Sequence, residues 1–458
     1  MPQSRDIGQA SGYRILAAVT AVLSTILALF GTARPLAAQG LPLIRDAEIE
    51  SLLSDYAKPI FKAAGLGDQR IAVRIVRSDT FNAFVLDGRN VFVHTGALTT
   101  ADTPNQVIGV IAHETGHIVG GHLAALRSRI ARDQTRVLLM RMLGLGVAIA
   151  TGQGAAMLAG DELVMRSILA ERRQQESAAD QAGLRFLNAT RQSGRGMLET
   201  FERFAQQEYL SDSQKDPFVL SHPVAANRMA QLREQAERSP NYGVKDSPQL
   251  QLRHDMMRAK LAGYLDRPQV VLNRYPPSDT SLPARYARAI ARFMQGGQGG
   301  LQAALGDVDA LIREQPQNPY FYELKADFLT RSGQPRQAIA PLRQALRLSA
   351  DANLIRVELA SALLATNESA VVNEASELLR KSLVEDENQG AYRALGEAYY
   401  RQGKQPEADA SIAQAYFLEG DVKQAQIFAK RSQRALPQGS PAWIKMDDII
   451  KYKPVSES

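Results

Sequence analysis

Two histidines and a glutamate in residues 113–117 have the spacing of a zinc-hydrolase motif. His113 and His117 are four residues apart, so on an α-helix both imidazoles lie on one face and can reach a single metal ion. Glu114 directly follows the first histidine, where its carboxylate can take a proton from an attacking water. We predict that His113 and His117 bind zinc and that Glu114 is the base of peptide-bond hydrolysis. The competing interpretation is a helix with two surface histidines.

The motif leaves the site one protein ligand short. His122 is one candidate, but a three-histidine site of the known spacing has its third histidine at position 123, which is Leu123. The other candidate is Glu176, in the sequence Glu176-Ser-Ala-Ala-Asp180, whose small residues favour close helix packing. Asp180 shares a helical face with Glu176 and could orient a ligand histidine. We favour Glu176 over the interpretation of a surface acidic pair.

The surrounding segments predict the elements that hold this motif. Residues 107–112 are apolar, as in a buried helix, and residues 46–61 have helical periodicity with acidic residues in the first turn. Residues 71–76 alternate as a strand, and residues 83–86 and 91–94 flank Asp87-Gly88 as a hairpin. The pattern predicts an α+β domain that is mostly helical with a small antiparallel sheet.

The second strand of the predicted hairpin is our candidate for substrate binding. A free sheet edge beside a zinc helix can pair with an extended peptide through main-chain hydrogen bonds. We expect Val91, Phe92, Val93 and His94 to form that edge. His94 itself is interpreted as an ordinary strand residue and not as a metal ligand.

A third group of polar residues follows farther along the chain. His222 stands between Ser221 and Pro223, and the proline favours a loop over a helix at this position. From the sequence alone His222 is interpreted as a residue at a helix start. It could also bind the zinc as a fourth ligand that keeps the enzyme latent, or stabilise the oxyanion. Arg228 could pair with Asp180 or with charge that develops during the reaction.

Composition and the amino terminus predict an exported protein. The chain has 458 residues and 45% hydrophobic residues, which is enough for two or three domains with cores. Residues 1–38 are interpreted as a signal peptide and not a retained anchor, because two arginines precede an apolar run and a small-residue cleavage region. Cysteine is absent, which excludes disulfides and thiol catalysis. The net charge of +6 comes without a long basic block, so we predict no nucleic-acid partner.

Residues 137–160 are apolar and glycine-rich, with Arg141 as the single charged residue. One membrane crossing here would put His117 and Glu176 on opposite sides of the membrane, and two crossings need about 40 residues. We therefore expect a helical hairpin. It is either partly buried with peripheral membrane contact or wholly buried.

The carboxy-terminal half predicts a second kind of architecture. Residues 238–282 are interpreted as a linker and a bridging helix, on which His254 is expected to be exposed. In residues 283–450 small and aromatic positions recur at about 34–36 residues, which resembles tetratricopeptide repeats. Such repeats form an all-α solenoid with a concave protein-binding surface. The alternative is a helical domain that merely stabilises the catalytic part.

The separated motifs around His113, Glu176 and His222 together resemble the HtpX/BepA-type zinc metallopeptidases over residues 43–237. The resemblance implies one Zn²⁺ per chain held by His113, His117 and Glu176, with Glu114 as the base. It also implies that Asp180 supports a ligand histidine and that His222 is a regulatory ligand. The predicted signal peptide and repeats are similar to the soluble periplasmic branch of that family.

This resemblance implies a function in the periplasm of a Gram-negative bacterium. The expected activity is hydrolysis of misfolded or stalled outer-membrane proteins, with substrates or partners docked by the repeats. The expected partner of the repeats is the outer-membrane protein assembly machinery. The alternative is a chaperone or assembly factor whose protease activity is latent.

Overall fold

The computed structural model describes residues 41–86, 88–125, 128, 156–205, 217–223, 226–349 and 352–453, and every structural statement below concerns these residues. The predicted signal peptide and most of the apolar segment 137–160 lie outside them. Residues 42–386 form one compact unit, and the chain from residue 387 belongs to a second. Within the described segments, no helix has both the length and the apolar character needed to cross a membrane.

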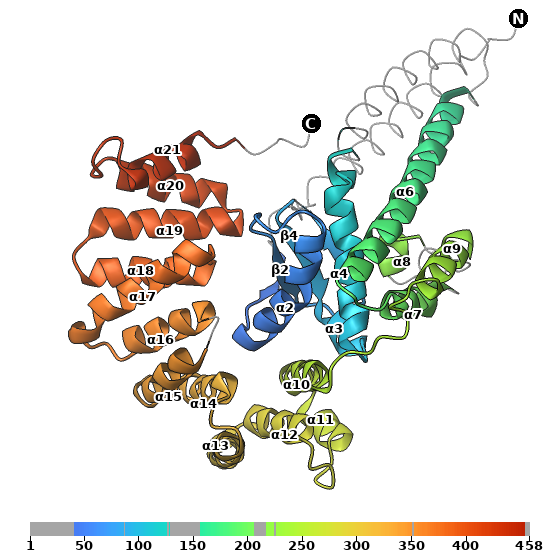
Figure 1. The fold of residues 1–458 in the computed structure, drawn as a ribbon. Helices are drawn as coiled ribbons and strands as arrows, with labels where there is room; N and C mark the ends of the chain where they lie inside the picture. The colour runs from blue at the N-terminus through green and yellow to red at the C-terminus, as the bar shows by residue number, and fades with distance from the viewer. Residues whose placement is uncertain are drawn as a thin grey trace, which may run out of the picture. The chain divides into compact units, whose positions relative to one another are not determined.

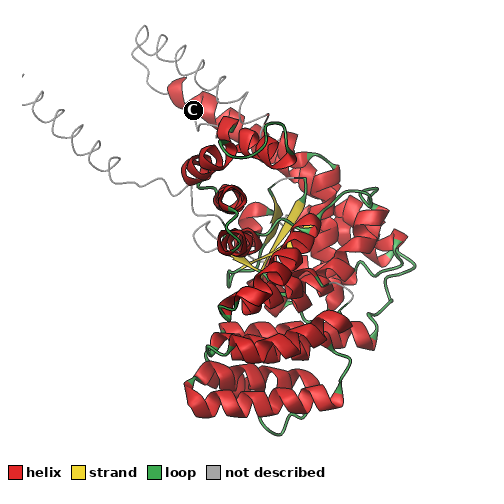
Figure 2. Cartoon of the chain, turned by 90° about the vertical axis from the view of Figure 1, so that its left-hand side faces the viewer, coloured by secondary structure: helices red, strands yellow, loops and turns green. Residues whose placement is uncertain are grey.

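A small sheet lies beside the helix that carries the histidine motif (Figures 1 and 2). Its strands are β1 (Leu43–Ile44), β2 (Ala72–Val76), β3 (Ala83–Val85) and β4 (Asn90–His94), in the order β1-β2-β4-β3. The predicted strands and the antiparallel hairpin of β3 and β4 are confirmed. The sheet is mixed and not antiparallel, because β4 runs parallel to β2 while β3 pairs on its other side.

The sheet order corrects the predicted substrate-binding edge. Val91, Phe92, Val93 and His94 belong to β4, which pairs with β2 on one side and with β3 on the other. Their main-chain groups are therefore not a free edge, and that prediction is wrong. The edge strand of this hairpin is β3, since its other side has no strand in the described sheet.

Helices surround the sheet in the amino-terminal part of the first unit. They are α2 (Ala47–Ala63), α3 (Thr95–Thr100), α4 (Pro104–Val119), α6 (Ala156–Ala189), α7 (Arg195–Ala205), α8 (Pro217–Ser221) and α9 (Ala226–Glu237). The predicted first helix is confirmed as α2, whose N-cap Asp46 accepts a hydrogen bond from the main chain of Ile49. These helices supply the apolar surface on which α4 packs.

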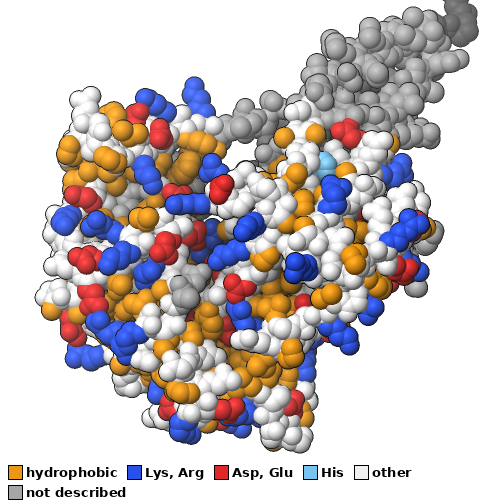
Figure 3. All heavy atoms as spheres, in the orientation of Figure 1, with side chains coloured by type: hydrophobic (Ala, Val, Ile, Leu, Met, Phe, Trp, Pro, Cys, Tyr) orange, Lys and Arg blue, Asp and Glu red, His pale blue; other side chains and the backbone are white. Residues whose placement is uncertain are grey.

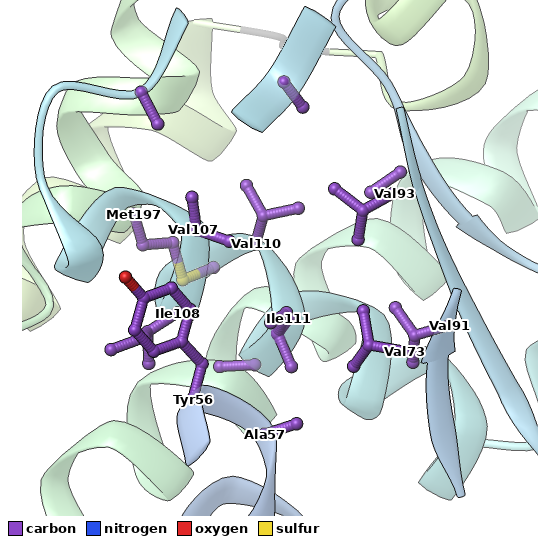
Figure 4. Packing of buried hydrophobic residues seen from close by; sticks show 14 of the residues in the cluster. Tyr56, Ala57, Val73, Val91, Val93, Val107, Ile108, Val110, Ile111 and Met197 are labelled. Atoms are coloured by element: carbon purple, nitrogen blue, oxygen red, sulfur yellow. The ribbon is translucent and has the colours of Figure 1, made fainter. Parts of the chain in front are cut away.

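Helix α4 is the centre of the core. Every residue from Pro104 to His117 is buried, and the apolar ones pack with Tyr56 of α2, the inner face of the sheet and Met197 of α7 (Figure 4). A Cβ at Gly109 would lie 2.7 Å from Cα of Met197, so α4 and α7 meet backbone to backbone. A helix enclosed in this way holds its side chains in one orientation.

The contact of α4 with α6 depends on small residues in both motifs. A Cβ at Gly116 would lie 2.7 Å from the carbonyl oxygen of Ala179, and one at Gly183 would lie 3.2 Å from the main chain of His113. Figure 1 shows the two helices side by side. This close approach brings the side chains of Glu176 and Asp180 to the histidines of α4.

Paired helices make up the rest of the first unit. They are α10 (Pro248–Leu265), α11 (Pro268–Arg274), α12 (Leu282–Gln295), α13 (Gly297–Glu314), α14 (Pro319–Arg331), α15 (Pro335–Leu348), α16 (Asn353–Ala365), the short η3 (Ser369–Val371) and α17 (Val372–Glu385). Successive helices pack as α12 with α13, α14 with α15 and α16 with α17. This succession is the predicted tetratricopeptide-like solenoid.

The second unit continues the same pattern of helix pairs. It contains α18 (Gln389–Arg401), α19 (Gln405–Glu419), α20 (Val422–Gln433) and α21 (Pro441–Lys451), and each helix packs on the next. Gly420 ends α19 with φ of 81°, in the left-handed region where glycine is favoured.

Cross-helix ion pairs recur on the surface of the repeats. Arg285 pairs with Glu314, Arg343 with Glu374 and Arg356 with Glu385, at separations of 29, 31 and 29 residues along the chain. On the face in Figure 3, positive and negative side chains are interspersed. Exposed pairs of this kind contribute about 0–1 kcal/mol each, so the apolar helix faces hold the solenoid together.

His254 of α10 is buried, contrary to the prediction that it is exposed. Its Nδ1 lies 3.0 Å from the hydroxyl of Tyr56, and its Nε2 lies 2.9 Å from the carbonyl oxygen of Ala101. The polar partners come from distant segments, which a sequence pattern does not reveal. The contact fixes α10 against α2 and the segment that follows α3.

A buried ion cluster joins the start of α2 to α10 and to α14 of the repeats. Lys260 of α10 lies 2.8 Å from Asp46, 3.3 Å from Glu48 and 3.2 Å from Glu323 of α14. Burial raises the pKa of Glu323 above its ordinary value, and the charge of Lys260 offsets only part of that rise. One ammonium therefore serves three carboxyl groups, and the cluster favours a proton on Glu323.

We expect Glu323→Gln to flatten the pH dependence of stability. Because the folded state holds the Glu323 proton more tightly than the unfolded chain, the wild-type free energy of unfolding falls as pH rises from about 5 towards 8. The glutamine imitates the protonated carboxyl, so the variant should be more stable than wild type at the upper end by at least about 1 kcal/mol. Denaturant unfolding at several pH values measures this, with exposed Glu377→Gln as the control. Parallel pH curves for the Glu323 variant and wild type would contradict the prediction.

Candidate metal centre

Four buried side chains converge beside α4. Their donor atoms, from His113, His117, Glu176 and His222, all lie within 4.8 Å of one another. Nε2 of His113 lies 3.1 Å from Nε2 of His117, 3.3 Å from Nδ1 of His222 and 3.4 Å from Oε2 of Glu176. Nε2 of His117 lies 3.4 Å from Oε1 of Glu176. The four groups therefore face one small volume.

These separations fit a metal ion. Tetrahedral ligands with bonds of about 2.1 Å are about 3.4 Å apart, close to the separations seen here. Neutral imidazole nitrogens and a carboxylate present only lone pairs to one another when they act as ligands, so a cation between them removes the repulsion. Three histidines and a glutamate form a donor set that suits a divalent transition metal. The residues present therefore fit the group that the motif predicts.

Three different segments supply the donors. His113 and His117 are one helical turn apart on α4, Glu176 lies on α6, and His222 follows the end of α8. The segment around His222 is held from two sides, because Arg172 donates to the carbonyl oxygen of Ser221 and the Ser221 hydroxyl donates to Asn82. His222 lies outside a helix, as the following proline favours, but it follows the end of α8, so its interpretation as a residue at a helix start is wrong.

An aromatic layer backs the site. Phe201 and Phe218 lie 5.6 Å apart, and their rings are 5.1 Å from His113 and 5.0 Å from His222 respectively. Phe81 and Phe204 extend this layer. An apolar surrounding lowers the local dielectric and strengthens the interaction of the donors with a cation.

Glu114 lies beside the four donors without belonging to them. Its side chain is buried, and Oε1 has no hydrogen-bond partner among the described residues. Oε1 lies 3.4 Å from Nε2 of His222. Burial raises the pKa of Glu114, and the charges of His222 and His113 offset part of the rise. A carboxylate with a raised pKa holds a proton better, which suits a general base.

Asp180 and Arg228 support the first histidine. Oδ1 of Asp180 lies 2.9 Å from Nδ1 of His113, the ring nitrogen that faces away from the donors. Arg228 donates two hydrogen bonds to Asp180, at 2.5 and 2.8 Å, and its guanidinium also lies 3.1 Å from Glu176. Of the two partners predicted for Arg228, the structure places it on Asp180. The arrangement fixes the ring of His113.

The charges around Glu176 keep it ionised. Burial raises its pKa, but the charges of His222 and Arg228 outweigh burial and hold the pKa well below its ordinary value. At His113 burial lowers the pKa, whereas the contacts with Asp180 and Glu176 raise it to about 9. The carboxylates therefore keep this small volume negative and favour a positive charge beside them, which a bound cation would supply in place of a proton on His113.

The structure brings together His113, Glu114, His117, Glu176 and His222. It places His94 elsewhere, with Nδ1 3.0 Å from the Thr80 hydroxyl, which agrees with its interpretation as an ordinary strand residue. The sequence prediction missed two contacts. His222 reaches the carbonyl oxygen of Ala83 in β3 at 3.2 Å, and His122 contacts His117. Neither follows from a spacing pattern.

Comparison with known proteins identifies this part of the chain. Residues 43–236 match the sequence profile of Peptidase family M48. These residues form a peptidase M48 domain. The matched segment contains all four donors and Glu114, so the convergent side chains lie within the M48 domain.

Relatives of the chain agree with this assignment. The beta-barrel assembly-enhancing protease of Escherichia coli K12 is 24% identical over 89% of this chain and 84% of its own length. The metalloprotease LoiP of the same strain is 25% identical over 41% of this chain and 73% of its own. The mitochondrial metalloendopeptidase OMA1 of Schizosaccharomyces pombe is 38% identical over 16% of this chain and 21% of its own. The protein with this M48 domain is a metalloendopeptidase.

We expect Arg228→Met to destabilise the M48 domain. The change leaves Asp180 buried without its bidentate partner, which costs about 3–5 kcal/mol of unfolding free energy. Denaturant unfolding measures the loss. Adding Asp180→Asn to Arg228→Met removes the uncompensated charge and should recover part of the stability. If the two single changes were additive in the double variant, the pair would not be coupled and the prediction would fail.

Proposed function

We propose that the chain is a zinc-dependent endopeptidase in which His113, His117 and Glu176 hold one Zn²⁺ and Glu114 is the catalytic base. The observation that carries this proposal is the convergence of the donor atoms within 4.8 Å of one another. Glu114 lies at their edge with a buried carboxylate oxygen that has no hydrogen-bond partner in the described structure. This combination suits peptide hydrolysis better than a purely structural metal site.

Several residues of the chain have separate roles in the proposed hydrolysis. Zinc in this site would act as a Lewis acid and lower the pKa of an attacking water to about 7. Glu114 accepts the water's proton and passes it to the leaving amine. Asp180 holds the ring of His113, and Arg228 holds Asp180. The aromatic layer excludes bulk water from the donors.

Strand β3 is the proposed docking edge for substrate. Main-chain pairing at an edge recognises extended, unfolded segments with little side-chain selectivity. The carbonyl oxygen of Ala83 on this strand lies 3.2 Å from His222, which places the edge next to the donors. A peptide paired here would pass close to Glu114.

The position of His222 favours a second candidate function. Its Nδ1 lies 3.1 Å from Glu176 and faces the other donors, as a fourth ligand would. Four protein ligands leave no position for water, which is the usual arrangement of a structural zinc site. We infer that His222 holds the enzyme latent, and that the chain could serve as a chaperone or assembly factor in this state.

The proposed substrates are misfolded or stalled outer-membrane proteins in a Gram-negative periplasm. The relatives named beta-barrel assembly-enhancing proteases, which align over 84–89% of this chain, support this choice. We further propose export by the signal peptide 1–38 and docking of the outer-membrane assembly machinery on the tetratricopeptide-like repeats. Peripheral membrane contact through residues 137–160 belongs to the same proposal.

Replacing Glu114 by Gln should abolish proteolysis and leave the metal bound. Glutamine cannot accept the water's proton, so we expect a loss of at least about 100-fold in the cleavage rate of an unfolded outer-membrane barrel protein. The assay compares wild type, Glu114→Gln and the exposed control Glu234→Gln, each with and without a chelator, alongside metal analysis.

Cleavage by wild type and Glu234→Gln that stops with the chelator supports the mechanism. Wild-type cleavage that survives the chelator refutes the metal mechanism. If no variant cleaves, but Glu114→Gln still supports assembly of the barrel protein in cells, the assembly-factor candidate replaces the protease.

Replacing His222 by Ala should raise the protease activity. The change removes the fourth donor and frees the carbonyl oxygen of Ala83, while the remaining three donors are kept. We expect a several-fold higher cleavage rate with one metal ion still bound per chain. A cleavage rate that falls together with the metal content would identify His222 as a required ligand and contradict the latent state.

A further inference from the structure

In both histidines of α4, one ring nitrogen faces the metal donors and the other faces away from them. In each ring Nε2 faces the other donors, so Nδ1 is the nitrogen that faces away. For His113 the outer nitrogen lies 2.9 Å from Asp180. For His117 the outer nitrogen lies 2.9 Å from Nδ1 of His122. His122 thus occupies, at the second ligand, the place that Asp180 has at the first.

The end of α4 is built to bring His122 back over the helix. The helix ends at Val119, and Gly121 has φ of 62°, in the left-handed region that favours glycine. The imidazole of His122 then folds over Gly120 so closely that a Cβ at position 120 would overlap Nε2 of the ring. Two consecutive glycines therefore make the contact between His122 and His117 sterically possible.

The hydrogen bond between the two rings determines their tautomers. A neutral imidazole that binds a metal through Nε2 carries its proton on Nδ1, so His117 must donate from Nδ1. His122 must then accept at Nδ1 and carry its own proton on Nε2. The short Nδ1–Nδ1 distance is compatible with only one proton between the rings.

We propose that His122 is a positioning residue for the metal site: it accepts the Nδ1 proton of His117 and holds that ring with Nε2 towards the metal. The proposal rests on the proposed metal site. His122 is not itself a donor, because the convergent group contains His113, His117, Glu176 and His222, and its Nδ1 is engaged with His117.

Loss of the His122 side chain should weaken metal binding. Residues that hydrogen bond to a ligand histidine typically contribute 10- to 100-fold to metal affinity. We expect His122→Ala to bind Zn²⁺ about 10- to 100-fold more weakly than wild type. His122→Gln retains an acceptor and should recover a large part of that affinity. Gly120→Ala keeps the histidine but displaces its ring, and should weaken binding in the same direction.

The experiment titrates Zn²⁺ into metal-depleted full-length protein against a competing fluorescent chelator. Val119→Ala is the control, because Val119 is exposed at the same helix end. The absorption spectrum of the Co²⁺-loaded protein provides a second measurement, since a rotated His117 ring changes the ligand field. Circular dichroism establishes that each variant is folded. If His122→Ala does not fold, His122→Gln and Gly120→Ala decide the question.

Weaker Zn²⁺ binding and an altered Co²⁺ spectrum in His122→Ala and Gly120→Ala, with Val119→Ala unchanged, support the proposal. Folded His122→Ala with affinity within twofold of wild type and the same spectrum overturns it. Failure of wild-type protein to bind one equivalent of metal would refute the proposed metal site instead. The two failures are therefore distinguishable.

Discussion

The metal site depends on one backbone contact, in which Gly116 of α4 meets Ala179 of α6. A side chain at position 116 would collide with the carbonyl oxygen of Ala179 and separate the helices. Glu176 and Asp180 would then move away from the histidines of α4. Because packed helix interfaces are as dense as crystals, such a separation could not be absorbed locally. The convergence of the metal donors therefore requires that no side-chain atoms lie between these two helices.

Buried charge is the second constraint on the molecule. Glu176 and Asp180 are both almost fully buried, and Arg228 contacts both. The arginine balances one carboxylate through a bidentate pair, which leaves the other to face a metal ion. Lys260 likewise balances buried carboxyl groups, at the place where the repeats join the catalytic part. Each cluster joins segments that are far apart in the sequence, so each makes packing specific as well as tight.

Local spacing predicted most of the metal site, and non-local pairing explains what it missed. His113 and His117 share a face because the helix period is local, and the small residues beside Glu176 indicate a close helix contact. Strand β4 lies inside the sheet because β2 pairs with the side that β3 leaves free. Alternation along one strand does not reveal which strands pair with it. The contact of His122 required a left-handed glycine turn, whose geometry leaves no spacing pattern. His254 is buried because its partners arrive from distant segments.

His222 touches both the donor group and the carbonyl oxygen of Ala83 on the edge strand. A peptide that pairs with this edge must compete with the histidine, so the two events share a coupling free energy. A partner that draws the segment after α8 away from the donors raises the affinity of the edge for peptide. By reciprocity, bound peptide raises the affinity for that partner by the same factor. In the proposed latent state, bound substrate therefore favours release of His222 from the donor group and acts as an activator.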